Sequence, residues 1–213
     1  MTIETRRRLQ NALWGLFIGD ALAIEHQNLT HRSENVTSAL GVLVPLLHAL
    51  LGGSEPRRTI SDYAQRVHPP QVTGDQLFEA YRDHQGPGNI PKRKMWEFHT
   101  LLVDTPYEVD RLVREDSETA VINHLFATAC YPEHGLPLLL YFAKAHNLDV
   151  ESALLANANA GGDNVHRAMV LGILIGAANK ELPANLKQGL IAFDELQTEI
   201  EAFSDIALGG TAI

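Results

Sequence analysis

The chain has 213 residues, of which 45% are hydrophobic and 20% are charged, and its net charge is −9 at neutral pH. These values are typical of one globular domain with a single hydrophobic core, so we expect one domain over residues 1–213. The negative charge argues against a nucleic-acid partner, because phosphate backbones are bound by clustered lysine and arginine. The one basic run, Arg6-Arg7-Arg8, is expected to be a solvated helix face.

The single cysteine, Cys130, excludes an internal disulfide and any zinc site built from several thiolates. It stands in an apolar stretch, where we expect a small core residue. The N-terminus lacks the pattern of a signal peptide, and no apolar run reaches the roughly 18 residues needed to cross a bilayer. We therefore expect a cytoplasmic protein without a membrane partner.

Apolar residues recur with helical spacing along almost the whole chain. The first helix carries its apolar face on Leu9, Ala12, Leu13, Leu16 and Phe17, and the second runs from Val36 to Leu51 with a kink at Pro45. Asp149 is a predicted N-cap, and Gln85–Pro91 is the one long loop signal. Strand-like alternation is nearly absent, so the predicted fold class is all-α. Further helices are predicted near residues 60–67, 74–83, 107–113, 117–130, 136–146, 149–158, 164–179 and 184–207.

Two short polar stretches interrupt the apolar pattern early in the chain. Gly19-Asp20-Ala21-Leu22-Ala23 ends the first helix, and Ser33-Glu34-Asn35-Val36-Thr37 opens the second. Asp20 either points into a central site or caps the next turn, and the sequence leaves both open. Glu34 is equally compatible with capping, since a carboxylate is stabilised at a helix N-terminus. With Asn35, however, it also offers oxygens to a metal or a ribose.

A third polar stretch, Asn157–Arg167, separates two apolar helical runs. Gly161 and Gly162 allow the backbone to turn tightly and to approach a ligand closely. The helix that follows begins with free N–H groups and a positive dipole end, which suit a phosphate or a ribose oxygen. Asp163 and His166 are three residues apart and therefore share a helix face. A cap at Asp163 explains only one of these polar residues, so we interpret the stretch as functional. The same helix presents small residues at every fourth position, suited to close helix packing: Ala168, Gly172 and Gly176.

Together these three stretches resemble the motifs of the ADP-ribosylglycohydrolase family. Gly19-Asp20-Ala21-Leu22-Ala23 is similar to the family's Gly-Asp-Ala-Leu-Gly motif in the first helix. Ser33-Glu34-Asn35-Val36 stands in place of Thr-Asp-Asp-Thr at a helix start. Gly161-Gly162-Asp163-Asn164-Val165-His166 resembles Gly-Gly-Asp-Thr-Asp-Thr and is likewise followed by a glycine-spaced helix. The resemblance implies the family's fold, a single-domain orthogonal helical bundle.

The departures from these motifs fall on the family's metal ligands. Members of the family hold two magnesium ions with the aspartates of the second and third motifs. Here Val165 replaces one aspartate, and Glu34-Asn35 replaces the earlier pair, so that two ligand carboxylates remain, Glu34 and Asp163. The resemblance therefore implies at most one divalent cation, Mg or Mn, and no two-magnesium cluster. His166, in place of a threonine, would instead favour a softer metal such as zinc or manganese.

These replacements resemble a divergent branch of the family that has Gly-Glu-Asn-Thr and Gly-Gly-Asp-Asn-x-His-Arg. The stretch Tyr131-Pro132-Glu133-His134-Gly135-Leu136-Pro137 is also similar to that branch. A consistent alternative set of polar residues indicates an altered activity or ligand.

The family resemblance implies a hydrolase that cleaves a glycosidic bond to ribose in an ADP-ribose-like or nucleoside-like substrate. Such a cleavage passes through an oxocarbenium-like state and needs a positioned water and a nearby carboxylate. Glu34 or Asp163 is expected to activate the water or bind the metal, and His166 to act as acid or base near neutral pH. The alternative is an inactive member that keeps the pocket and binds a nucleotide or a protein partner. The catalytic candidates are Glu34, Asp163, His166 and Glu25, and the substrate-binding candidates are Asp20, Asn35, Asn159, Gly161, Gly162, Asn164 and Arg167, the last toward a phosphate.

Overall fold

The structure is a computed structural model that describes residues 3–21, 34–70, 72–85, 107–122 and 124–208. The described residues form eleven helices and no strand, with one isolated bridge between Ile122 and Phe126. The predicted all-α fold is thus confirmed. None of the described helices is both long and apolar enough to cross a membrane. The helices are α1 (Ile3–Ala21), α2 (Glu34–Leu51), α3 (Pro56–Ala64), α4 (Gly74–Gln85), α6 (Val109–Glu115), α7 (Glu118–Val121), α8 (Pro132–Ala145), α9 (Val150–Ala160), α10 (Asn164–Ala178), α11 (Ala184–Gln188) and α12 (Phe193–Ala207).

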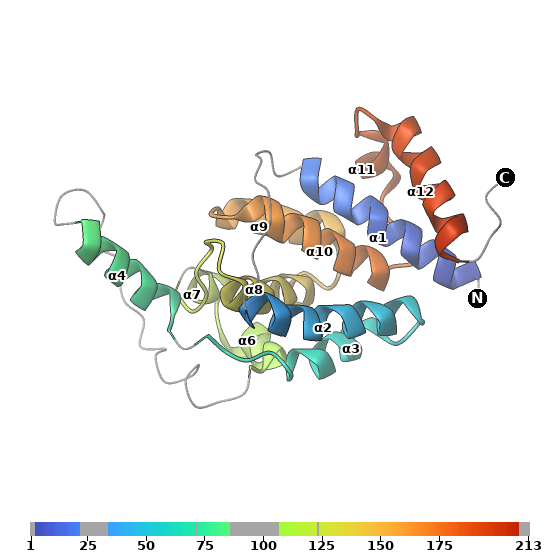
Figure 1. The fold of residues 1–213 in the computed structure, drawn as a ribbon. Coiled ribbons are helices and arrows are strands. Elements are labelled where there is room, and N and C mark those ends of the chain that lie inside the picture. The colour runs from blue at the N-terminus through green and yellow to red at the C-terminus, as the bar shows by residue number, and fades with distance from the viewer. Residues whose placement is uncertain (1–2, 22–33, 71, 86–106, 123, 209–213) are drawn as a thin grey trace.

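Helices α1 and α10 make the most extensive contact between helices of the described chain (Figure 1). Gly176 allows this contact, because a Cβ atom there would lie 2.1 Å from the carbonyl oxygen of Asn11. The close packing predicted from the spacing of small residues is confirmed. Arg8, near the start of α1, contacts the last residues of α10, so the two helices run antiparallel.

The end of α10 is closed by polar side chains of α1. The last carbonyls of a helix have no partner within it. Arg8 Nη1 donates to the carbonyls of Ala177 and Ala178 at 3.1 and 3.2 Å, and Asn11 Nδ2 donates to that of Asn179 at 3.0 Å. Arg8 is only 4% exposed, so the expected solvated face is wrong for this residue. The cause is tertiary, since a helix C-terminus stabilises a nearby cation.

Helix α8 lies at the centre of the remaining helices and packs against α2, α3, α6, α9 and α10. All of its residues from Leu136 to Lys144 are buried. A helix that is buried on every side belongs to the core rather than the surface. Lys144 is accommodated because its ammonium group contacts Ser61 of α3 and Asp110 of α6, both at 2.7 Å.

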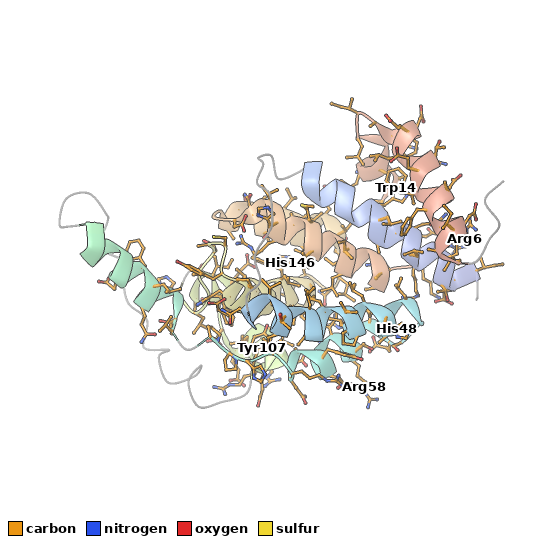
Figure 2. The ribbon with its side chains drawn as sticks, in the orientation of Figure 1. Arg6, Trp14, His48, Arg58, Tyr107 and His146 are labelled. Atoms are coloured by element: carbon orange, nitrogen blue, oxygen red, sulfur yellow. The ribbon has the colours of Figure 1, made fainter. Side chains whose placement is uncertain are left out.

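Helices α11 and α12 cover α1 on another side. Trp14 stacks on Phe193 with ring centroids 5.3 Å apart, and Arg6 pairs with Asp205 (Figure 2). The single helix predicted over 184–207 is wrong at its middle, because the chain leaves the helix between Gly189 and Ala192. The break brings Phe193, the first residue of α12, onto Trp14.

The helix predicted over 117–130 is also wrong beyond Val121. Backbone groups after this point are used in contacts with distant segments. The Leu125 carbonyl accepts from Gly74, and the Thr128 carbonyl accepts from the Asp163 N–H at 2.7 Å. These contacts take the groups that a helix would bond internally. Cys130 follows in the same segment and is exposed, which corrects the expected core position.

Helix α4 extends away from the bundle and is held at its first turn (Figure 1). The Asp75 N–H donates to the His124 carbonyl, and the Asp75 carboxylate contacts His124 Nδ1 at 2.9 Å. Thr73 and Gln76 cap the helix reciprocally, as in a capping box. The loop predicted over Gln85–Pro91 lies outside the described residues after its first residue.

Candidate functional site

The turn between α9 and α10 depends on both of its glycines. Gly161 and Gly162 have φ values of 68° and 64°, which are unfavourable for other residues. A Cβ atom at Gly162 would also lie 2.1 Å from the carbonyl oxygen of Thr128, so a side chain has no room. The tight turn predicted from the sequence is confirmed, but the close neighbour in the structure is the backbone at Thr128.

Arg167 is buried beneath this turn and stabilises it through three hydrogen bonds. Its Nε donates to Asn157 Oδ1 at 2.8 Å, its Nη1 to the Thr128 carbonyl at 2.6 Å, and its Nη2 to the Gly161 carbonyl at 2.7 Å. Burial lowers the pKa of Arg167 to about 10, and Asp163 acts in the opposite direction. The guanidinium joins three segments of the protein. The phosphate contact expected from the sequence is a different role, and it stays a prediction.

The three asparagines of the stretch Asn157–Arg167 differ in their burial and in their contacts. Asn157 is fully buried and donates to the Asn164 carbonyl at 2.8 Å, so it belongs to the scaffold of the turn. Asn164 Nδ2 donates to the Ala158 carbonyl at 3.4 Å. Asn159 is exposed and lines a shallow pocket of about 290 Å³ together with Glu118 and His124. The expected ribose contacts of Asn159 and Asn164 stay predictions.

Asp163 and His166 form the pair that their spacing predicted. His166 Nδ1 lies 2.6 Å from Asp163 Oδ1, with both side chains partly exposed at 34% and 24%. Asp163 occupies the N-cap position of α10, yet its side chain makes no capping hydrogen bond. Capping therefore does not explain this carboxylate. Because a carboxylate only accepts, Nδ1 of His166 carries the proton and Nε2 is the nitrogen left for exchange with a ligand.

A cavity of about 500 Å³ opens between the first turns of α2, the segment 67–77 and the start of α8. Its volume is in the range of small-molecule sites. Of the predicted site residues whose side chains are described, only Asn35 lines it, and Asn35 is exposed. Its polar lining consists of Asn35, Ser38, His68, Tyr131, Glu133 and His134, and the remainder is formed by aliphatic residues and prolines.

His134 forms a buried part of the cavity wall and is 1% exposed. Its Nδ1 accepts from the Ala127 N–H at 3.0 Å, so Nε2 carries the proton. Burial lowers the pKa of His134 to about 4, which keeps the ring neutral near pH 7. Thr128 follows Ala127 in the chain, and its backbone carbonyl accepts hydrogen bonds from the Asp163 N–H and from Arg167 Nη1. The two-residue segment Ala127-Thr128 thus connects the cavity wall to the Asp163–His166 pair.

The sequence reasoning missed Thr128 and the cavity residues Ser38 and Glu133. The Thr128 contacts described above are made by its backbone carbonyl. Every residue type has this group, so the sequence gives no sign of these contacts. The resemblance did single out Tyr131–Pro137, but without a site role. Ser38 and Glu133 line the same cavity only because the fold places α2 beside α8.

Several predicted residues fall outside the described part of the chain. These are Glu25, together with the side chains of Asp20 and Glu34. The backbone of Asp20 belongs to the last turn of α1, at the end of the α1–α10 pair where α10 begins. The assigned roles of Asp20, Glu25 and Glu34 stay predictions.

Of the two metal ligands expected from the resemblance, only Asp163 has a described side chain, because that of Glu34 lies outside the described residues. No group of three or more His, Cys, Asp or Glu side chains within the described ranges is arranged to hold a metal. Asp163 Oδ1 is engaged by His166, and Val165 offers no ligand atom. The expected single cation and the expected absence of a two-magnesium cluster both stay predictions.

The described chain is thus all-helical, with an aspartate–histidine pair at the junction of α9 and α10 and a cavity of about 500 Å³ at the start of α8. The family model described as ADP-ribosylglycohydrolase matches residues 22–211, and the chain belongs to this family. No curated protein and no solved structure gave a significant match.

Proposed function

We propose that the protein hydrolyses a glycosidic bond to ribose in an ADP-ribose-like or nucleoside-like substrate. Membership of the ADP-ribosylglycohydrolase family supports the reaction class. The observation that carries the proposal is the 2.6 Å contact between His166 and Asp163, whose carboxylate does not cap its helix. Partly exposed groups of this kind are available to a ligand.

In this proposal His166 transfers protons and Asp163 orients it. The carboxylate fixes the ring with Nδ1 protonated, which directs Nε2 toward the reacting atoms. A histidine so held can take a proton from the attacking water or give one to the leaving group. Cleavage through an oxocarbenium-like state also requires a carboxylate near the sugar, for which Asp163 and Glu34 are the two candidates.

The scaffold around the pair serves to keep it in place. Arg167 and Asn157 form internal hydrogen bonds of 2.6 to 2.8 Å. These bonds fix the turn that carries Asp163. A catalytic pair needs support of this kind, because small displacements of a reacting group cost large factors in rate. The cavity beside Asn35 offers the space for the rest of a nucleotide.

Product release from N-linked and O-linked ADP-ribosides would test the proposal directly. The expected result is release of ADP-ribose by the wild type, loss of release in Asp163→Asn and His166→Ala, and no change in Asp194→Asn. Asp194 is an exposed aspartate of α12, remote in sequence from these motifs. Release that is unaffected by either site variant would overturn the proposed roles.

Calorimetric titration with ADP-ribose would separate the hydrolase from an inactive binding protein. Titrations in chelator, in magnesium and in manganese are compared. Binding without product release from any riboside supports the alternative, a nucleotide-binding member without catalysis. Binding that is the same in chelator and in metal contradicts the predicted single cation. Absence of heat in every condition removes ADP-ribose as the ligand.

A further inference from the structure

Glu133, at the start of α8, is the only acidic side chain among the described residues that line the 500 Å³ cavity. Its Oε2 atom is buried and has no hydrogen-bond partner in the described structure. Glu133 also forms no ion pair with the described residues. A buried carboxylate oxygen without a partner is unfavourable, because it has lost its hydrogen bonds to water and gained none in the protein.

Local structure offsets only part of this cost. Glu133 stands in the first turn of α8, where the helix dipole stabilises negative charge. The dipole does not supply the missing hydrogen bond. The adjacent His134 is neutral and has its Nδ1 engaged by Ala127, so it provides no positive charge. No donor among the described residues reaches this oxygen, and Glu133 is one of the residues that line the cavity.

The chemistry of the cavity selects the kind of group that fits. A carboxylate accepts hydrogen bonds and repels anions, so it does not suit a phosphate. The aliphatic and proline walls favour an uncharged, compact ring. Asn35 and Ser38 of α2 line the cavity and add amide and hydroxyl groups. Two neighbouring hydroxyls on a sugar ring meet these conditions, since a carboxylate binds a ribose hydroxyl in many nucleotide sites.

We propose that Glu133 binds the hydroxyl groups of a ribose in this cavity and orients the nucleotide with its phosphates toward solvent. The inference rests on the proposed function for the identity of the sugar. It assigns a substrate-binding residue on α8, outside the three motifs that define the site by sequence.

Calorimetric titration with ADP-ribose tests this role in the wild type, Glu133→Gln and Glu133→Ala. Loss of a hydrogen bond to a charged group weakens binding by about tenfold to hundredfold, so both variants are expected to show Kd values raised by that factor. Glu151→Gln, an exposed glutamate of α9, is the matched control and is expected to bind as the wild type does. Wild-type affinity in both Glu133 variants, or no wild-type binding, would overturn the inference.

Thermal unfolding of the same variants distinguishes a binding residue from a structural one. Removal of a buried, unpartnered carboxylate is expected to leave Tm unchanged or to raise it. A large fall in Tm in Glu133→Gln and Glu133→Ala would show that the side chain supports the fold and would contradict the binding role. The product-release experiment stays separate: binding that depends on Glu133 without product release rejects the hydrolase and leaves this inference intact.

Discussion

At the C-terminal end of α10, Gly176 lies against the backbone of α1, and Arg8 binds the last carbonyls of the helix. At the N-terminal end, Gly162 lies against Thr128 and Arg167 binds the carbonyls around the turn. Each end therefore combines a glycine in close contact with a buried arginine. The N-terminal end also carries the partly exposed pair Asp163 and His166, in which the Asp163 side chain makes no capping bond.

The comparison separates two uses of polar residues at the ends of one helix. The buried arginines bind backbone carbonyls, whereas the partly exposed pair is the one to which we assign a chemical role. Variants at the two ends are therefore expected to differ in which property they lose. The four predictions below follow this difference, from the largest expected effect on stability to the smallest.

The largest effect is expected at Gly176. In Gly176→Ala the new Cβ atom would overlap the backbone of Asn11, so α1 must move away from α10. Overpacking against backbone is expected to lower the free energy of unfolding by about 3 kcal/mol or more, measured by urea denaturation. Gly41→Ala in α2 is the control, because its Cβ would meet nothing within 4 Å. This control is expected to be slightly stabilising, by up to about 1 kcal/mol. Equal losses in both variants would contradict the tight α1–α10 contact.

Arg167→Met is expected to lower the free energy of unfolding by about 3 kcal/mol, because it leaves buried acceptors without a donor. The acceptors are Asn157 Oδ1 and the carbonyls of Thr128 and Gly161. Arg58→Met is the control, since its side chain is 82% exposed and is expected to contribute less than about 1 kcal/mol. If Arg167→Met keeps its stability but loses ADP-ribose binding, the phosphate role expected from the sequence is favoured.

Stability is expected to depend on pH through His134. Its folded pKa of about 4 lies below the ordinary value of 6.5. Between these values the unfolded chain binds the proton and the folded protein does not, so stability is lost as pH falls below 6.5. The loss from pH 7.5 to pH 5 is expected to be about 2 kcal/mol. His134→Gln should remove this part of the pH dependence, whereas His48→Gln, at an exposed position of α2, should keep it. The same pH dependence in both variants would argue against a neutral, buried His134.

The smallest effect on stability and the largest on activity are expected at Asp163. Asp163→Ala removes a partly exposed pair and no cap, so the free energy of unfolding should fall by less than about 1 kcal/mol. Asp149→Ala is the comparison, because Asp149 caps α9 by accepting from the Ser152 N–H at 2.8 Å. It should lose about 1 kcal/mol and keep its activity. A reversed pattern would contradict the proposed chemical role of Asp163.

Local patterns predicted much of the fold. The 3.6-residue spacing of apolar side chains indicated helices, and the spacing of small residues indicated the close face of α10. The Asp149 cap was also correct. Errors occurred where a helix would have been possible locally but distant partners took its backbone groups, as at Leu125 and Thr128. The break before Phe193 is a different case, since its tertiary partner is the Trp14 side chain, on which the Phe193 ring stacks.

For the candidate site, the sequence by itself determined the glycine turn and the Asp163–His166 pair, because both depend on residues a few positions apart. Only the tertiary structure decided that Arg167 is an internal donor, that Arg8 is buried, and that Glu133 faces a cavity without a partner. The physical reason is that burial and hydrogen-bond satisfaction depend on which segments meet. A side chain of the same type is exposed, structural or available to a ligand according to neighbours that lie far away in the sequence.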